Sequence, residues 1–302
     1  MNAAAAATAS AAAASAASAA SAASGTAERA ERYGDRIFNH GHAEEHARLL
    51  ALADVLDPHS LHTLRTPKTP PARPVHQVLE LAAGAATVTR RLLDDLPTAH
   101  VTATDLDGRF LTGLHHERLT VLRHDVTRDD LPEGHYDLIH ARYLLHHLPD
   151  REHVFARIVS WLAPGGRLVI EDPARFSVEA AHDPRYRRVS LGAMRVLADR
   201  LGTDCAHWGP NLPRTAAAHG LTDVTLHTAV PTVTHDSPMG RFWHLSLRHL
   251  ADDITALPGI EPEDTRSVID ALTRPGLIEP GMATVTVTAT KPVEQSRGGR
   301  RP

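Results

Sequence analysis

The chain contains one cysteine, Cys205, among its 302 residues. A single thiol excludes an intramolecular disulfide and a zinc site built on cysteine pairs, and it fits a reducing compartment. A surplus of charge of one sign is also missing, because the formal net charge is -4. The sequence therefore lacks the basic character of proteins that bind nucleic acids or anionic membranes, and we expect neither kind of partner.

Residues 1–25 consist almost wholly of Ala and Ser, so they lack both an amphipathic face and the apolar run of a membrane span. They also lack the basic start and the leucine-rich stretch of a signal peptide. We expect a disordered tail here, and a second one at residues 294–302, which are rich in Arg and Gly. Cytoplasmic residence follows by default.

Aromatic residues make up only 4% of the chain, but 42% of all residues are hydrophobic, which suffices for one large α/β domain or two small ones. Residues 26–74 predict a helical arm and a linker. Asp57-Pro58 predicts the end of the arm's apolar helix, and four prolines in residues 66–74 predict an extended connector. The arm either covers an edge of the main domain or closes over a ligand with Tyr33, Phe38, His40 and His42.

The main domain, residues 75–293, opens with a strand at 76–81, a small-residue bend at 82–86 and a helix at 87–95. The bend lets a ligand lie against the backbone, and the helix N-terminus suits a nucleotide-like ligand. A tight turn that only packs helix against strand is an equal alternative. Further strands are expected at 100–105, 119–126, 136–141 and 167–172, and helices at 108–115 and 151–162. This alternation predicts a doubly wound parallel sheet with its ligand site at the carboxyl ends.

Acidic residues lie at the tips of the first three strands. Asp105 follows Glu80 by 25 positions, where a carboxylate can accept both hydroxyls of a ribose. Asp105 could instead cap the helix at 108–115, but Asp107 is the better cap. Asp125 can accept from an exocyclic amine such as that of adenine, or it can begin a turn with Asp129 and Asp130.

Five segments now form an ordered set: 80–86 (ELAAGAA), Asp105, 124–126 (HDV), 136–141 (YDLIHA) and 162–168 (LAPGGRL). In order and spacing they resemble the class I S-adenosylmethionine-dependent methyltransferases. The resemblance continues loosely through 216–224, and residues 282–290 alternate like the family's antiparallel last strand. It implies a Rossmann-like, seven-stranded, mostly parallel sheet. The glycine fingerprint of nicotinamide-binding enzymes is absent, because Gly84 fits only its middle position.

The resemblance implies S-adenosylmethionine as cofactor. It places the methionine end against the bend, the ribose at the second strand, the adenine at the third and the sulfonium above the fourth. The positions implied are Glu80, Ala82, Gly84, Asp105, Leu106, Asp125, Val126, His140 and Ala141. The family usually has glycine where Ala86 stands and often where Ala82 stands. If these positions need positive φ, alanine costs about 1 kcal/mol.

His146 and His147 follow the fourth strand, where the resemblance places the methyl-bearing end of the cofactor. An imidazole there can act as general base toward a substrate hydroxyl, or it can only pack beside the cofactor. Glu171 and Asp172, at the end of the fifth strand, are a second candidate pair, unless they cap a turn. Asp172 and His182 lack the clustered acids of a metal site, so we expect no metal.

Insertions at about 175–212 and 231–280 carry most of the large aromatics, which either form a core or line an apolar acceptor pocket. We expect a methyltransferase that acts on an oxygen of a small specialised metabolite. Methylation of nitrogen or carbon, on a small molecule or a modified peptide, is an alternative. A catalytically silent cofactor-binding partner protein is an alternative of another class. The sequence leaves open whether the chain forms a homodimer.

Overall fold

The computed structural model describes residues 32–34, 37–39, 41, 43–67, 73–204 and 207–293. The two predicted tails, His40, His42 and Cys205 lie outside the described residues. All that follows concerns the compact unit that begins at Arg32.

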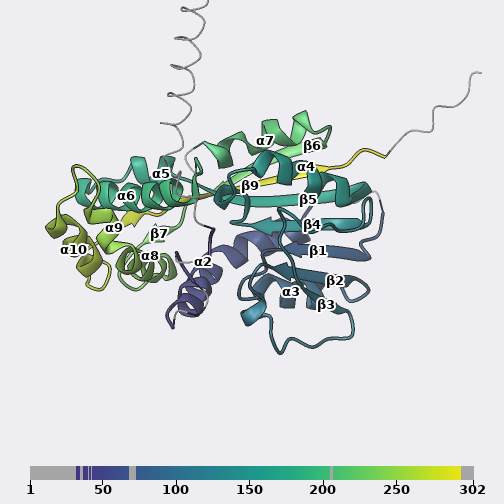
Figure 1. Ribbon diagram of the computed structural model, residues 1–302, viewed down its shortest axis with the longest axis horizontal. Helices are drawn as coiled ribbons and strands as arrows, with labels where there is room; N and C mark the ends of the chain where they lie inside the picture. Colours follow the sequence, from purple (N-terminus) through teal and green to yellow (C-terminus); the bar gives the residue numbers. More distant parts are fainter. Residues whose placement is uncertain are drawn as a thin grey trace, which may run out of the picture. The chain divides into compact units, whose positions relative to one another are not determined.

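A seven-stranded sheet forms the centre of the molecule (Figure 1). Its strand order is β3-β2-β1-β4-β5-β9-β6. The first five pair in parallel, whereas β9 lies antiparallel between β5 and β6. The predicted doubly wound sheet with an antiparallel last strand is therefore confirmed. The strands are β1 (Gln77–Leu81), β2 (His100–Asp105), β3 (Leu119–Arg123), β4 (Tyr136–Arg142), β5 (Leu162–Ala174), β6 (Thr222–Ala229) and β9 (Ala283–Thr290).

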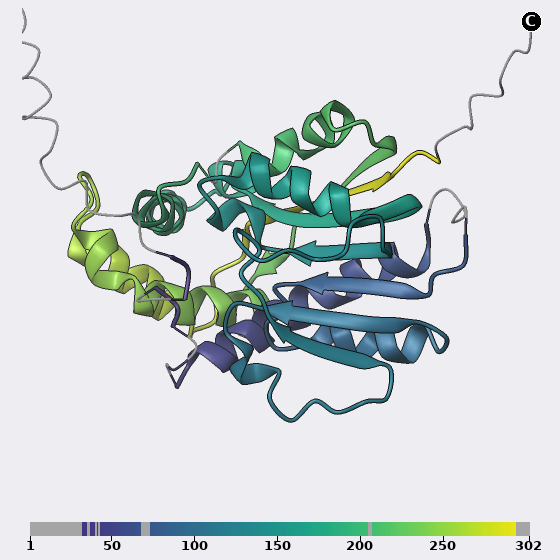
Figure 2. The same cartoon turned by 45° about the vertical axis from the view of Figure 1, so that its right-hand side comes forward.

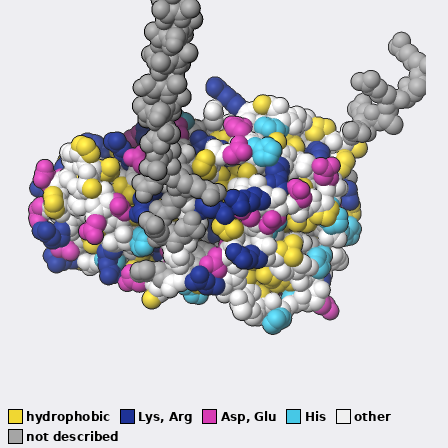
Figure 3. Space-filling view, viewed as in Figure 1, with side chains coloured by type: hydrophobic (Ala, Val, Ile, Leu, Met, Phe, Trp, Pro, Cys, Tyr) yellow, Lys and Arg dark blue, Asp and Glu magenta, His cyan; other side chains and the backbone are white. Residues whose placement is uncertain are grey.

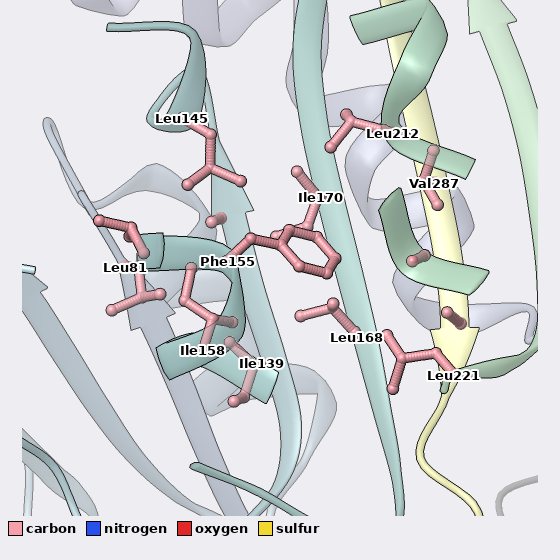
Figure 4. Close-up of a cluster of buried hydrophobic side chains, with 14 of the residues drawn as sticks. Leu81, Ile139, Leu145, Phe155, Ile158, Leu168, Ile170, Leu212, Leu221 and Val287 are labelled. Carbon is pink, nitrogen blue, oxygen red and sulfur yellow. The ribbon is translucent and has the colours of Figure 1, made fainter. Parts of the chain in front are cut away.

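Helices cover both faces of this sheet because side chains alternate along each buried strand. On one face, Phe155 and Ile158 of α4 (Arg151–Trp161) point toward Leu168 and Ile170 of β5, and α7 (Trp208–Ala218) adds Leu212 (Figure 4). The other face is covered by α2 (Glu45–Arg65) and α3 (Thr87–Asp95). Charged side chains of both signs are interspersed on the surface in Figure 3.

The two insertions form a helical cap beyond the carboxyl ends of the parallel strands (Figure 2). The cap has its own core, in which Tyr186, Trp243 and Leu247 pack with Leu52 and Leu56 of α2. The helix α2 thus packs against both the sheet and the cap. The cap elements are α5 (Phe176–Glu179), α6 (Pro184–Leu201), β7 (Thr232–Val233), α8 (Pro238–His249), α9 (Ala251–Thr255), α10 (Pro262–Ala271) and β8 (Glu279–Pro280).

Several predicted boundaries were wrong. The helix α2 continues through Asp57 and Pro58, because the turn after Pro58 is held against the sheet: Ser60 is fully buried and Arg167 donates to the carbonyl of Leu64 at 2.7 Å. The helix predicted at 108–115 is only a 3-10 turn, η1 (Gly108–Phe110). The third strand ends at Arg123, before the turn at Asp125, and the fifth begins at Leu162.

Among the described residues, no helix combines the length and the apolar character needed to cross a lipid bilayer.

Candidate functional site

The bend between β1 and α3 has three residues with positive φ: Ala82 at 52°, Gly84 at 52° and Ala86 at 59°. A Cβ atom on Gly84 would meet only the carbonyl of Ala82, at 4.0 Å, so the outer side of the bend is open. Ala86 is the N-cap of α3, and no side chain caps that helix. The bend therefore presents backbone groups and a positive helix end to the carboxyl edge of the sheet.

Asp105 lies at the tip of β2 and is 8% exposed. Its Oδ2 accepts the N–H of Gly84 at 2.9 Å, and its Oδ1 accepts the N–H of Asp107 at 3.0 Å. Asp107 is the N-cap of η1, as predicted, and accepts the N–H of Arg109. Asp105 was predicted to be available to a ligand because Asp107 is the better cap, and the structure shows that its carboxylate also holds the bend. The backbone carbonyl of the adjacent Leu106 accepts a hydrogen bond from the side chain of Arg123 at 3.1 Å.

Glu80 is 3% exposed and points inward, below the bend. Its carboxyl group accepts a hydrogen bond from Thr89 of α3. Burial raises the pKa of this group to about 7. The side chain of Glu80 thus ties β1 to α3 across the bend.

Asp125 begins a turn, since its Oδ1 accepts the N–H of Thr127 at 3.1 Å and its carbonyl accepts the N–H of Asp129 at 2.8 Å. Its other oxygen pairs with Arg32 of the arm at 2.7 Å. The hydrogen bonds of Thr127 and Arg32 hold the pKa of Asp125 below its usual value despite desolvation. Val126 is buried, at 7% exposure. The third strand tip is therefore in contact with the arm.

His140 and Ala141 lie within β4 and not beyond it, and each is 1% exposed. They face opposite sides of the sheet. Ala141 packs on the α4 face, whereas His140 lies between Glu80 and Glu171. The side chain of His140 is therefore one layer below the edge at which a ligand would bind.

His146 and His147 lie in η2 (Leu145–His147), directly after β4, with ring centroids 3.6 Å apart. His146 is 3% exposed, and its Nδ1 lies 2.9 Å from Oδ1 of Asp172 on β5. The second oxygen of Asp172 accepts the indole N–H of Trp208 at 2.8 Å. The fully buried Asp172 therefore fixes the imidazole of His146, a pairing that orients general bases in other enzymes.

His147 stacks on Tyr33 of the arm, with ring centroids 4.0 Å apart and an interplanar angle of 17°. Tyr33 accepts a hydrogen bond from Arg48, whose guanidinium lies 3.8 Å above the ring centroid of Phe38. Burial keeps the pKa of His147 well below its usual value, so this imidazole is neutral. Tyr33, one of the arm residues that could close over a ligand, therefore lies against His147, and the ring of Phe38 lies 6.0 Å from that of Tyr33.

Sequence reasoning missed three contacts of this site. Trp208 was assigned to an apolar insertion, but its N–H binds Asp172. Arg32 and Arg48 were not singled out at all, although they tie the arm to Asp125 and Tyr33. No local pattern marks these residues, because each partner lies far away in the sequence. The sequence did mark Asp172 and the histidine pair as separate candidates, and the structure brings them together.

A family model described as a methyltransferase domain matches residues 79–168. This segment contains Glu80, the bend, Asp105, Asp125 and both histidines, but not Asp172 or Trp208. Residues 79–168 therefore match a methyltransferase domain, as the resemblance predicted.

Relatives of this methyltransferase domain match only part of the chain. Trans-aconitate 2-methyltransferase from Deinococcus radiodurans is 28% identical over 150 residues, which cover 49% of this chain and 52% of the relative. Methyltransferase str3 from Strobilurus tenacellus is 32% identical over 100 residues, covering 32% of this chain and 35% of that protein. The chain thus spans about half or less of the length of these relatives.

Solved structures share the fold at low identity. A Bacillus halodurans protein, provisionally assigned as a methyltransferase, superposes with a TM-score of 0.51 at 18% identity, covering 78% of this chain and 99% of that one. Phosphoethanolamine N-methyltransferase 2 from Haemonchus contortus, bound to phosphomonomethylethanolamine and S-adenosylhomocysteine, superposes with a TM-score of 0.52 at 13% identity, covering 83% and 58%.

Proposed function

We propose that the protein transfers a methyl group from S-adenosylmethionine to a small molecule, and that the accepting atom is an oxygen of a specialised metabolite. The observation that carries the choice of oxygen is the contact between His146 and Asp172 at 2.9 Å. An oxygen acceptor must lose a proton as the new bond forms, whereas an amine can react without a base. A buried, carboxylate-held imidazole is suited to the oxygen acceptor.

The residues at the carboxyl edge fit the proposed cofactor. The bend is open above Gly84, and the uncapped N-terminus of α3 can receive a carboxylate. Asp105 retains acceptor capacity for hydroxyl groups, because a carboxylate can accept about four hydrogen bonds. Ala82 and Gly84 would hold the amino-acid end and Asp105 the ribose, with Asp125, Val126 and Leu106 toward the base. When bound, the cofactor supplies a methyl group already activated by a sulfonium.

The protein's own contribution is to orient the acceptor and to take up its proton. If Nδ1–H of His146 donates to Asp172, the basic lone pair lies on Nε2. Asp172 cannot turn away, because Trp208 holds its second oxygen. The stack of Tyr33 on His147 covers the same region and excludes water from it. Holding two reactants in place can lower a barrier by roughly 7–11 kcal/mol.

Turnover of S-adenosylmethionine carrying a labelled methyl group, with a metabolite extract as acceptor, tests this proposal. We expect labelled product from the wild type and a loss of rate of about 100-fold or more for His146→Ala. His153→Ala is the matched control, since His153 is an exposed histidine of α4 that takes no part in the contact between His146 and Asp172. A His146→Ala protein with undiminished turnover contradicts the oxygen acceptor.

Two alternatives are decided by the same assay. Methylation of nitrogen or carbon is the first alternative, and the nitrogen acceptor is supported by similarity to phosphoethanolamine N-methyltransferases, including one from Arabidopsis thaliana that is 35% identical over 51 residues. An amine acceptor tolerates both His146→Ala and His147→Ala. A catalytically silent cofactor-binding protein is supported by the positive φ of Ala82 and Ala86, where family members usually have glycine. Such a protein binds S-adenosylhomocysteine but labels no metabolite.

A further inference from the structure

Three titratable side chains form one buried row across the middle strands of the sheet. Nδ1 of His140 on β4 lies 3.9 Å from Oε1 of Glu80 on β1, and Nε2 lies 3.9 Å from Oε1 of Glu171 on β5. Each of the three residues is at most 3% exposed. Thr89 of α3 donates to Glu80, and Ser60 of α2 donates to Glu171 at 2.6 Å. The row therefore joins three strands to the two helices on that face.

Hydrogen bonding within this row is incomplete. Among the described residues, neither imidazole nitrogen of His140 has a hydrogen-bond partner, and the same holds for Oε1 of Glu171, although all three atoms are buried. An unsatisfied buried polar atom costs roughly 1–3 kcal/mol. A proton held between an imidazole nitrogen and a carboxylate oxygen satisfies both atoms after a small movement. The unpaired atoms thus indicate protons held between these side chains.

The nearest charged groups outside the row partly cancel one another. Arg142 and Asp57 pair with each other at 2.9 Å, so their charges offset one another beside it. Arg167 donates to backbone carbonyls of α2, and His59 contacts Thr286 at 2.8 Å. The charged and titratable groups that face the row are Asp57 and His59 on α2, Asp105 on β2, Arg142 on β4, and Arg167 and Asp172 on β5.

Desolvation favours the uncharged form of every member. It raises the pKa of Glu80 and of Glu171 to about 7 and lowers that of His140 to about 3. Two carboxyl groups that still carry protons near neutral pH then flank a neutral imidazole.

We propose that Glu80, His140 and Glu171 share protons, so that the protonation of each depends on the other two. His140 and Glu171 thereby act through Glu80 as positioning residues for the bend at residues 82–86. Glu80 lies two positions before the bend. Its side chain accepts a hydrogen bond from Thr89 of α3, just beyond the bend, and its carbonyl accepts from Thr104 of β2 at 3.2 Å. A shift of Glu80 therefore moves both ends of the bend. Only the claim that the bend binds a cofactor rests on the proposed function.

The expected pH dependence has a definite sign. A carboxyl group whose pKa is raised by folding stabilises the fold fully below its unfolded pKa, and this contribution is lost as pH rises to about 7. His140, whose pKa is lowered, contributes in the opposite sense, with stability lost as pH falls. Because two carboxyl groups oppose one imidazole, we expect the urea midpoint of the wild type to fall between about pH 5 and pH 7.5.

A double-mutant cycle tests whether the protons are shared. Urea midpoints are measured across this pH range for Glu80→Gln, Glu171→Gln and the double variant, each with and without His140→Gln. We expect either single variant to lose more than half of the pH-dependent fall and the double variant to lose little more. With His140→Gln, the two effects should become additive. Glu279→Gln is the matched control, since Glu279 is a buried carboxylate of the cap that should keep the wild-type slope.

Additive effects of the two carboxyl variants in the presence of His140 would overturn the sharing of protons. Positioning is read from amide hydrogen exchange of the bend without cofactor, corrected for intrinsic rates. We expect faster exchange above about pH 7 in the wild type and no such step in Glu171→Gln. An unchanged step overturns the positioning role. If His140→Gln does not fold, the other variants and the wild-type exchange profile still decide. A wild type that binds no S-adenosylhomocysteine contradicts the proposed function. The unfolding and exchange data, which are measured without cofactor, still test proton sharing and the positioning of the bend.

Discussion

Asp105 accepts the backbone N–H of Gly84 at 2.9 Å, which ties the tip of β2 to the bend after β1. Its second oxygen accepts the N–H of Asp107 at 3.0 Å. The carboxylate thus shapes two neighbouring loops and still has acceptor sites for hydroxyl groups. These two roles can be separated by substitution.

Asp105→Ala removes both roles, and we expect it to weaken binding of S-adenosylhomocysteine by roughly 1–3 kcal/mol, measured by calorimetry. Asp105→Asn keeps an acceptor for Gly84 and should lose less. Asp107→Ala is the control, because that side chain caps η1 by accepting the N–H of Arg109, whereas Asp105 accepts the N–H of Gly84 in the bend. If Asp105→Ala binds as tightly as the wild type, Asp105 does not belong to the cofactor site.

The two alanines at positive φ make opposite predictions for a change to glycine. Ala82 at 52° is half-buried, so Ala82→Gly relieves backbone strain at little cost in packing and should stabilise the protein by about 1 kcal/mol. Ala86 is fully buried, and loss of its methyl group should offset most of the gain. Urea denaturation measures both. Ala83, whose φ is negative, supplies the control: Ala83→Gly should destabilise. A destabilised Ala82→Gly protein contradicts the strain at that position.

The sequence predicted the parts of this fold that depend on local pattern. The helix at 87–95 and the strand at 100–105 have the predicted bounds, because apolar spacing and flanking small or polar residues specify them locally. The strain at Ala82 and Ala86 was also foreseeable, since the resemblance placed glycine there. Alternation of strands and helices was sufficient to predict the layers.

Features that depend on distant partners could not be predicted in this way. The passage of α2 through Pro58 is explained by burial of Ser60 against Glu171, which lies 111 residues away. The inward position of His140 depends on the strand register that pairs it with Glu80. Likewise, the bond from Trp208 to Asp172 exists only because α7 packs against β5. In each case tertiary contact decided between local alternatives.

Pro58 lies on the exposed side of α2, where it removes the N–H that would bond to the carbonyl of Asp54. We expect Pro58→Ala to stabilise the protein by about 1–3 kcal/mol, as a rise in melting temperature. The neighbouring Asp57→Ala should do the reverse, because Asp57 pairs with Arg142 at 2.9 Å. A Pro58→Ala protein less stable than the wild type would show that the proline holds a bend that the sheet requires.

Trp208 and Trp243 are equally buried, each 3% exposed, but only Trp208 donates a hydrogen bond among the described residues. Trp208→Phe leaves one oxygen of the fully buried Asp172 without its donor, so we expect a loss of about 1–3 kcal/mol in the free energy of unfolding. Trp243→Phe removes no hydrogen bond and should cost clearly less. Because Asp172 holds His146, Trp208→Phe should also lower kcat for methyl transfer while the affinity for S-adenosylhomocysteine stays unchanged. Equal effects of the two substitutions on stability and on kcat would show that the indole N–H of Trp208 has no role in orienting His146.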